Sequence, residues 1–258
     1  MPRVVAVANQ KGGVGKTTTA VNLAASLAVL ERSVVLMDLD PQANATSGMG
    51  VDPKSLSCTI YDCVTRGTKL ANALLPTSVP KLQVVPANAD LVGAEVELVS
   101  VADREQILRA ALAEAAFPCD YVFIDCPPAL GLLTLNALVA ASAVLIPVQA
   151  EYYAMEGLGR LLATVQRVQA SWNPGLELEG IVLTMFDARN SLARQVADEI
   201  RGHFKEKVYQ TLIPRNVTLA EAPSYGKPVL LYNAGSTGSQ AYLDLAKEFS
   251  RHGEKSAR

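Results

Sequence analysis

The chain has 258 residues, enough for one large α/β domain or two small ones. Half of its residues are hydrophobic and only 5% are aromatic, so we expect an aliphatic core that suits a parallel sheet buried on both faces. A formal net charge of −2 excludes a uniformly basic protein, and any DNA-binding surface must be a local patch. The four cysteines lack paired C-x-x-C spacing, which argues against a zinc site or a disulfide framework. No signal-peptide pattern opens the sequence and no apolar run reaches membrane-spanning length, so we expect a cytoplasmic protein without a stable membrane anchor.

Short apolar runs bounded by turn residues or charges predict strands at residues 3–8, 33–37, 82–86, 121–125, 144–148, 180–184, 208–213 and 229–232. Helical periodicity predicts helices between them, at 16–30, 103–116, from about 151, 191–204 and 239–252. Alternation of strands and helices indicates a parallel sheet with right-handed crossovers. We therefore predict a single α/β domain over residues 1–252, with a mostly parallel twisted sheet flanked by helices on both faces. Residues 253–258 should form a frayed tail, and residues 44–80 give the weakest signal.

A glycine-rich turn joins the first predicted strand to the first predicted helix, which is the context of a phosphate-binding loop (P-loop). Glycines let backbone N–H groups approach an anion closely, and the helix that follows points its positive end at the same place. In such a loop Lys16 would reach the β- and γ-phosphates of a nucleotide, and the Thr17 hydroxyl would ligate Mg²⁺. The predicted nucleotide-binding residues of this loop are Lys11, Gly12, Gly13, Val14, Gly15, Lys16, Thr17 and Thr18.

Aspartates end two further predicted strands, at the edge of the sheet where ligands gather. Asp125 follows an apolar strand, as expected of a Walker B aspartate that holds a water molecule on Mg²⁺. Alternation places Asp38 and Asp40 on the same side of their strand, and Pro41 ends it. From spacing alone, these two aspartates are as consistent with loop capping as with a role in the reaction.

The loop carries lysine at its first and sixth positions, Lys11 and Lys16, and Gln10 stands where the general pattern has glycine. This variant resembles the deviant Walker A ATPases, and within that group the ParA/Soj chromosome- and plasmid-partition proteins. The resemblance extends from about residue 3 to about residue 250. Its segments are Asn9-Gln10-Lys11-Gly12-Gly13-Val14-Gly15-Lys16-Thr17-Thr18, Asp38-Leu39-Asp40-Pro41-Gln42, Ile124-Asp125-Cys126-Pro127-Pro128, Ile213-Pro214-Arg215-Asn216 and Glu221-Ala222-Pro223-Ser224-Tyr225-Gly226-Lys227-Pro228.

The resemblance implies an ATPase that uses ATP and Mg²⁺ and forms a nucleotide-sandwich dimer. It implies that Lys11 reaches across that dimer to the partner's phosphates, much as an arginine finger does. It also implies that Asp40 orients the attacking water and that Asp38 lies nearer the metal. The catalytic residues would thus be Lys11, Lys16 and Asp40, and the metal site would involve Thr17, Asp38 and Asp125.

An adenine ring needs apolar walls and a few backbone or amide partners. The segment that contains Pro214, Arg215 and Asn216 matches the base-contacting loop of the resembled family. Met185 follows another predicted strand and offers a second wall, although plain core packing explains a methionine there equally well.

Basic residues gather around the predicted helix at 191–204. Arg189 precedes it, and Arg194, Arg201 and Lys205 follow at spacings that predict one shared face. A charged helix face is usually only solvated, but several members of the resembled family bind duplex DNA without sequence preference at this place. Some relatives also carry a basic residue where Thr218 stands here, which this chain lacks.

These features predict a ParA/Soj-type DNA-segregation ATPase, cytoplasmic and associated with the nucleoid. Its ATP-dependent homodimer would bind double-stranded DNA non-specifically. A ParB/Spo0J-type centromere-binding partner would stimulate the weak intrinsic ATPase activity and so release the dimer from DNA. One alternative is a MinD-type membrane-surface regulator of division, which needs an amphipathic C-terminal helix with a basic face. A second is an iron–sulfur carrier like the nitrogenase iron protein, for which Cys126 lacks a close partner in sequence.

Overall fold

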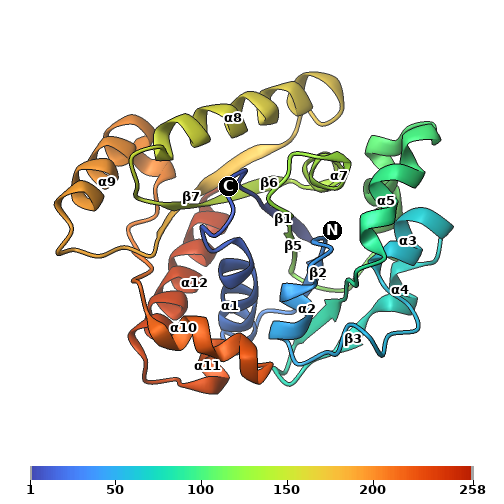
Figure 1. Cartoon of the computed structure of the whole chain (residues 1–258), viewed down its shortest axis with the longest axis horizontal. Helices are drawn as coiled ribbons and strands as arrows, with labels where there is room; N and C mark the ends of the chain where they lie inside the picture. The colour runs from blue at the N-terminus through green and yellow to red at the C-terminus, as the bar shows by residue number, and fades with distance from the viewer. Residues whose placement is uncertain (1, 257–258) are drawn as a thin grey trace.

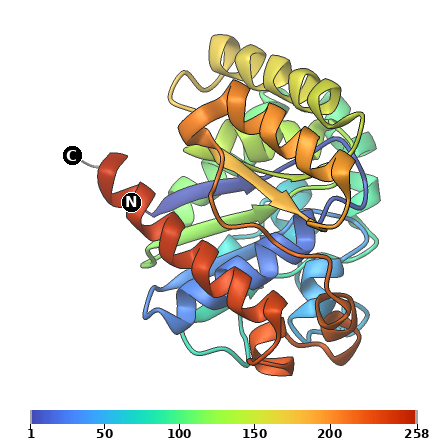
Figure 2. The same cartoon turned by 90° about the vertical axis from the view of Figure 1, so that its left-hand side faces the viewer.

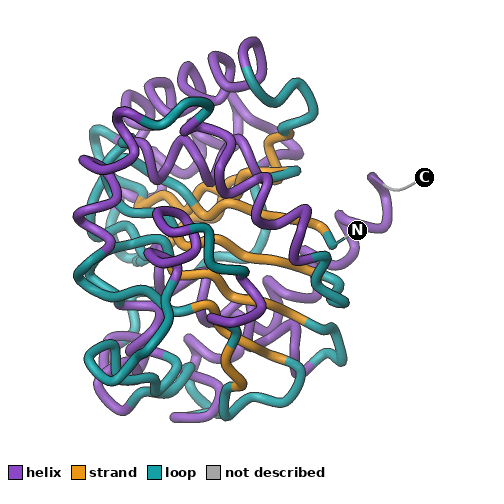
Figure 3. Tube along the Cα trace, turned by 90° about the vertical axis from the view of Figure 1, so that its right-hand side faces the viewer, coloured by secondary structure: helices purple, strands orange, loops and turns teal. Residues whose placement is uncertain are grey.

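The computed structural model describes residues 2–256, and it contains a seven-stranded sheet in the order β3-β4-β2-β5-β1-β6-β7. All neighbouring strands are parallel except β3 and β4, so the predicted mostly parallel sheet is confirmed. Figure 3 shows the strands running side by side through the middle of the molecule. The strands are β1 (Arg3–Val7), β2 (Val34–Asp38), β3 (Leu75–Pro76), β4 (Leu82–Val85), β5 (Tyr121–Asp125), β6 (Ala143–Gln149) and β7 (Glu177–Thr184).

Helices cover both faces of the sheet, as the aliphatic composition predicts (Figure 1). The α-helices are α1 (Lys16–Val29), α2 (Asn44–Gly48), α3 (Ile60–Arg66), α4 (Leu70–Ala73), α5 (Leu91–Glu97), α6 (Ile107–Ala115), α7 (Leu132–Ala140), α8 (Ala154–Ser171), α9 (Ser191–Phe204), α10 (Val217–Glu221), α11 (Val229–Tyr232) and α12 (Thr237–Ser256). Short 3₁₀ turns occupy Leu98–Ser100, Arg104–Gln106, Lys205–Lys207 and Ala222–Tyr225. No helix among the described residues is both long enough and apolar enough to span a membrane.

Two hydrophobic cores lie on the two faces of the sheet, and β1 supplies both by strict alternation. Val5 and Val7 belong to the core that α1 and α12 cover, whereas Ala6 belongs to the core on the other face. Figure 2 shows α12 crossing the sheet beside α1, while α8 and α9 lie on the opposite side. Because β1 is central, the loop that follows it is anchored from both faces.

The predicted strand at 208–213 is wrong, because its middle does not pair with the sheet. Its two ends reach β7 and the residues after it through isolated bridges, and the N–H groups of Tyr209 and Ile213 donate to carbonyls of β7. Between them, the backbone N–H groups of Gln210 and Thr211 donate to the carboxylate of Glu248 on α12, at 2.7 and 3.0 Å. A side chain therefore satisfies the donors that a β-ladder would have used.

The predicted strand at 229–232 is also wrong, because the segment is the short helix α11. Pro228 precedes it with φ −57°, a value that suits the start of a helix. The N–H of Val229 donates to the Asn22 side chain at 2.7 Å, which holds this helix against α1. At the chain end, α12 continues to Ser256, past the predicted domain end at residue 252, and residues 257–258 lie outside the described residues.

Candidate nucleotide-binding site

The loop between β1 and α1 has the conformation that a phosphate cradle requires. Gly13 and Gly15 have φ of +74° and +84°, in the left-handed region that favours glycine. Lys16 begins α1, and its Nζ donates to the Lys11 carbonyl at 3.2 Å, across the mouth of the loop. The loop is held to β7 because the Thr184 hydroxyl donates to the Val14 carbonyl at 2.8 Å. The predicted loop is thus preformed around the Lys16 side chain.

Lys16 lies among the acidic groups that end two strands. Its burial lowers the pKa of its amine, while Asp125 and Asp40 both raise it. A buried cation at a helix N-terminus, with its own loop folded around it, is well placed to receive phosphate oxygens.

Asp125 and Asp38 stand opposite each other at the carboxyl ends of β5 and β2. Both side chains are fully buried. Neither carboxylate oxygen of Asp125 has a hydrogen-bond partner. Burial, followed by the charge of Asp38, raises the pKa of Asp125 well above its usual range. The Thr17 hydroxyl lowers the pKa of Asp125, although it makes no hydrogen bond to either carboxylate oxygen.

An unpartnered buried carboxylate beside a threonine hydroxyl fits a hydrated Mg²⁺. This ion is usually held by one or two protein groups together with substrate phosphates, so a protein cage is not required. Thr17 would supply a direct ligand and Asp125 would hold a metal-bound water. The chemistry that Mg²⁺ brings is neutralisation of the phosphate charge.

Asp38 is engaged differently from Asp125, although the sequence placed both near the metal. Its Oδ2 accepts from the Thr46 backbone N–H at 2.8 Å and from the Thr46 hydroxyl at 2.7 Å, and its Oδ1 accepts from the Asp40 N–H at 3.1 Å. Burial raises the pKa of Asp38 to about 6, which the bonds from Thr46 oppose. The Thr46 hydroxyl also accepts from the N–H of Ala87, beyond β4. Asp38 thus fixes the loop that carries Asp40, and sequence reasoning missed Thr46 because its partners are distant in the chain.

Asp40 lies in that loop and is 7% exposed. Its Oδ1 accepts from the Gln42 N–H at 2.9 Å, which closes an Asx turn and leaves Oδ2 without a partner in the nearby loop. The charge of Asp40 also raises the pKa of Lys16. A fixed carboxylate near the phosphate lysine can accept a hydrogen bond from an attacking water.

Lys11 points away from its own loop. Its Nζ pairs with the Glu151 carboxylate, which follows β6, and both side chains remain 44% exposed. The backbone of Lys11 is fixed because its N–H donates to the Asn9 side chain at 3.0 Å. The ammonium group of Lys11 therefore lies at the outer rim of the site.

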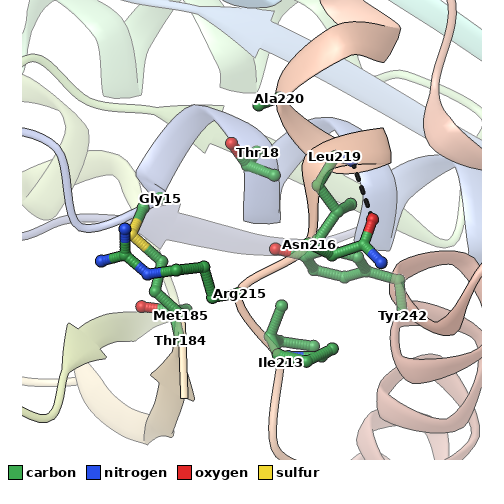
Figure 4. A pocket seen from close by; sticks show the side chains of 11 residues that line it. Gly15, Thr18, Thr184, Met185, Ile213, Arg215, Asn216, Leu219, Ala220 and Tyr242 are labelled. Atoms are coloured by element: carbon green, nitrogen blue, oxygen red, sulfur yellow. Dashed lines mark hydrogen bonds between the residues drawn. The ribbon is translucent and has the colours of Figure 1, made fainter. Parts of the chain in front are cut away.

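A cavity of about 280 Å³ adjoins the loop, large enough for a purine base. Figure 4 shows Met185 and Arg215 on one side of it and Leu219, Asn216 and Tyr242 on the other. The lining residues are Gly15, Thr18, Thr184, Met185, Ile213, Pro214, Arg215, Asn216, Leu219, Ala220 and Tyr242. The sequence identified Met185, Pro214, Arg215 and Asn216. It missed Tyr242, which reaches the cavity from α12.

Two loops that are distant in sequence form the walls of this cavity. The Phe186 N–H donates to the Ile213 carbonyl at 2.9 Å, and the Arg215 N–H donates to the Phe186 carbonyl at 3.2 Å. The Asn216 side chain accepts from the Leu219 N–H and donates to the Thr237 hydroxyl. Asn216 therefore caps α10, and its side chain shapes the wall rather than standing free to meet a base.

The predicted DNA-binding residues lie around α9, outside the nucleotide site. Arg189 is 91% exposed and pairs with Asp187 at 2.8 Å; its hydrogen bonds lower the pKa of Asp187 to about 2. Arg194 is exposed on α9. Arg201 is half-buried, with Nη2 near the Gln210 carbonyl at 3.5 Å. Lys205 has φ +48° and lies beyond the end of α9, so the prediction that it shares one helical face with Arg194 and Arg201 is wrong.

A glycine loop between a central strand and a helix, with a buried aspartate on the neighbouring strand, defines a P-loop ATPase that uses ATP and Mg²⁺. A family profile described as an AAA domain matches residues 2–178. The chain is 53% identical over 249 residues to chromosome partitioning protein ParA of Myxococcus xanthus, covering 96% of this chain and 88% of that protein. It is 51% identical over 253 residues to sporulation initiation inhibitor protein Soj of Bacillus subtilis, covering 98% and 100%. The chain belongs to the ParA/Soj family of chromosome-partitioning ATPases.

Solved structures agree with this fold. A Mycobacterium smegmatis crystal structure described as cobyrinic acid a,c-diamide synthase, with bound ADP and magnesium, has a TM-score of 0.86 and 39% identity, covering 100% of this chain and 97% of that one. The MinD cell-division ATPase of Pyrococcus furiosus has a TM-score of 0.80 at 24% identity, covering 97% and 99%, which shows the fold alone.

Proposed function

We propose that this chain segregates DNA as an ATP-dependent dimer in which each copy completes the other's active site. The observation that carries the proposal is the position of Lys11. Its ammonium group lies at the rim of the site and pairs with Glu151, while Lys16 alone occupies the phosphate loop. A half-exposed cation at the rim can reach the phosphates of a second copy that faces it.

In this dimer the P-loop amides and Lys16 bind the phosphates, and Asp40 orients the attacking water. Lys11 of the facing copy neutralises charge that develops on the transferred phosphoryl group. The intrinsic turnover is slow, because a positioned water without an activating partner is an incomplete catalyst. ATP thus serves both as substrate and as part of the dimer interface.

DNA binding would rest on the exposed cations at the amino-terminal end of α9 and just beyond its carboxyl end, chiefly Arg189, Arg194 and Lys205. These groups belong to α9 and its flanking turns, and Figure 2 shows where this helix lies. The contacts would be to phosphates, so binding should weaken steeply with salt and show little sequence preference. Pairing two weak patches in one dimer raises avidity without new contacts.

A ParB/Spo0J-type centromere-binding protein would stimulate hydrolysis and release the dimer from DNA, which places the working protein at the nucleoid. The names of the relatives support a role in chromosome partition for this chain, since ParA of M. xanthus covers nearly its whole length. The alternative of a MinD-type membrane regulator gains no comparable support, because the MinD match is at 24% identity.

Sedimentation of Asp40→Ala with saturating ATP and Mg²⁺ tests the dimer. We expect a dimer with ATP and a monomer with ADP, and a monomer under both conditions would refute the proposal.

Arg189→Glu tests the DNA-binding surface. It should keep the ATP-dependent dimer, while its affinity for DNA should fall at least tenfold. Arg66→Glu is the matched control, since Arg66 is an exposed arginine that also pairs with a nearby aspartate, on α3. An equal loss of DNA binding in both variants would refute the role of α9 in DNA binding.

A further inference from the structure

Two glycines from distant parts of the chain touch each other beside the nucleotide site. A Cβ added to Gly50 would stand 2.9 Å from the Gly226 carbonyl oxygen, and one added to Gly226 would stand 2.8 Å from the Gly50 Cα. Both residues also have left-handed backbones, with φ of +81° and +62°. Any side chain at either position would push two backbone segments apart, because the atoms that it meets are backbone atoms.

Gly50 belongs to the segment that holds Asp40. It lies just beyond α2, and its N–H donates to the Ser47 carbonyl at 2.9 Å. In the same helix Thr46 donates its N–H and hydroxyl to Asp38, which in turn accepts from the Asp40 N–H. Both Thr46 and Asp38 are fully buried. A displacement of Gly50 therefore reaches the loop of Asp40 through α2 and two buried side chains.

Gly226 belongs to the segment that forms one wall of the base cavity. It follows the 3₁₀ turn Ala222–Tyr225, which continues α10 without a break. Leu219 and Ala220 of α10 line the cavity. The Gly226 N–H donates to the Pro223 carbonyl at 3.0 Å, which fixes this glycine to the turn. A base that presses on α10 therefore acts on Gly226 through one short segment.

The same wall is packed tightly against α1 and α12. Asn22 is buried on α1, where its side chain accepts from the Val229 N–H at 2.7 Å and donates to the Thr18 carbonyl at 2.8 Å. A Cβ added to Gly238 on α12 would stand 2.6 Å from Leu219 Cγ. Close-packed segments transmit a displacement rather than absorb it. Occupation of the cavity is therefore felt at the far end of the wall.

The glycine contact joins the wall to the Asp40 segment without a side chain between them. Figure 1 shows α2 close to α10 and α11, beside α1, and α2 contacts the 3₁₀ turn. A contact between side chains can yield by a change of rotamer, but two touching backbones have no rotamers to change. Movement of the cavity wall is therefore passed to the Asp40 loop as backbone movement.

We propose that Gly50 and Gly226 are positioning residues, whose contact couples a base in the cavity to the placement of Asp40 for hydrolysis. With a base bound, the wall holds the Asp40 carboxylate where it orients the attacking water. Without a base the loop relaxes, so a bare polyphosphate binds the phosphate loop but is cleaved slowly. The contact thus selects nucleoside triphosphates over other triphosphates. This inference rests on the role proposed above for Asp40.

Amide hydrogen exchange in the unchanged protein tests the coupling without a mutation. ADP and inorganic diphosphate, each with Mg²⁺, offer the loop the same two phosphates, but only ADP has a base for the cavity. At saturating concentrations we expect the amides of residues 44–51 to exchange about tenfold more slowly with ADP than with diphosphate. Equal exchange under the two conditions overturns the inference, whether or not the variants below fold.

Turnover of ATP and of inorganic tripolyphosphate tests whether the glycine contact carries the coupling. Water attacks the terminal phosphorus of each, and ADP or diphosphate leaves. At saturation the parent should release phosphate from ATP about tenfold faster, and Gly50→Ala and Gly226→Ala should lose this advantage through a slower ATP rate alone. The ATP concentration that gives half the maximal rate should change by less than about threefold. An advantage that both variants retain overturns the inference.

Gly67→Ala is the matched control, because Gly67 has φ of +68° but a Cβ added there meets nothing within 4 Å. It introduces the same backbone strain without the contact, so it should keep the parental ratio of the two rates. All variants are assayed below their Tm, and sedimentation should show that each keeps its ATP-dependent dimer. An equal loss of the ratio in Gly67→Ala assigns the effect to strain and overturns the inference. Loss of the dimer in Gly50→Ala or Gly226→Ala assigns the contact to assembly and also overturns it.

Failure of the proposed function gives a different result. If Asp40→Asn hydrolyses ATP at the parental rate, Asp40 has no role in the reaction and both proposals fall. If Asp40→Asn is inactive while the parent cleaves ATP and tripolyphosphate equally fast, only the coupling falls.

Discussion

Replacing Asp125 by asparagine should stabilise the nucleotide-free protein while damaging its function. The wild-type carboxylate is fully buried, faces Asp38 on the neighbouring strand, and has no hydrogen-bond partner for either oxygen. A buried polar group without a partner costs about 1–3 kcal/mol, and more when it is charged. Asparagine keeps a buried polar group at this place but removes the charge and its repulsion with Asp38, so the free energy of unfolding should rise, by about 1 kcal/mol or more. For a chain of this size that corresponds to a rise in Tm of roughly 2–12 °C.

Asp38→Asn is the matched control, because the same exchange on the adjacent strand should act in the opposite direction. The Asp38 carboxylate accepts three hydrogen bonds, two from Thr46 and one from the Asp40 N–H. An amide nitrogen in place of one oxygen leaves a donor facing a donor, and should lower stability by about 1–3 kcal/mol. Two neighbouring buried aspartates are thus expected to give opposite signs.

Thermal unfolding without nucleotide, at pH 7.5 and at pH 5, measures both variants. A carboxyl group whose folded pKa is raised destabilises the folded state as pH rises through that pKa, and the cost vanishes below the unfolded pKa near 4. The pKa of Asp125 is raised well above its usual range, so the stability advantage of the Asp125→Asn protein should shrink as the pH falls from 7.5 to 5. With Mg²⁺ and ATP the order should reverse, because the wild-type carboxylate then gains a partner. A less stable Asp125→Asn protein without nucleotide would refute this reasoning.

Three further outcomes follow from the site. Asp40→Asn should keep the bond from the Gln42 N–H and bind ATP normally, while turnover measured by phosphate release falls roughly 10²–10⁴-fold. Glu151→Gln removes the ion pair that holds Lys11 within its own copy and so frees Lys11 for a facing copy. Half-exposed ion pairs contribute about 0–1 kcal/mol. The ATP concentration that gives half-maximal dimerisation, measured by sedimentation, should therefore fall by less than about fivefold. Gly226→Ala should lower Tm in thermal unfolding, because its Cβ would stand 2.8 Å from the Gly50 Cα at a φ of +62°.

Local signals in the sequence were sufficient for the parts of the site that are contiguous in the chain. The phosphate loop is one segment, and its glycines, its lysine and the strand and helix around it all lie within residues 3–29. The position of Asp125 at a strand end could be predicted because an apolar run ends directly at it. The central strands were found for the same reason, since burial on both faces leaves an unbroken apolar run.

Features that depend on distant partners could not be found in this way. The segment 208–213 has the composition of a strand, but the Glu248 carboxylate on α12 takes the N–H groups of Gln210 and Thr211. No pattern within so short a segment indicates a partner that lies 38 residues further along the chain. The cavity wall from Tyr242 was missed for the same reason, because the packing of α12 against α1 brings it there.

The two aspartates that end β2 and β5 show how such contacts decide chemistry. The residue type, the strand position and the burial are the same for Asp38 and Asp125. The difference lies in Thr46, which satisfies one oxygen of Asp38 while nothing satisfies Asp125. An aspartate with its hydrogen bonds made holds a loop in place, and one without them retains the capacity to organise a hydrated cation. Hydrogen-bond satisfaction therefore distinguishes the two buried carboxylates here, and it is a property of the folded chain.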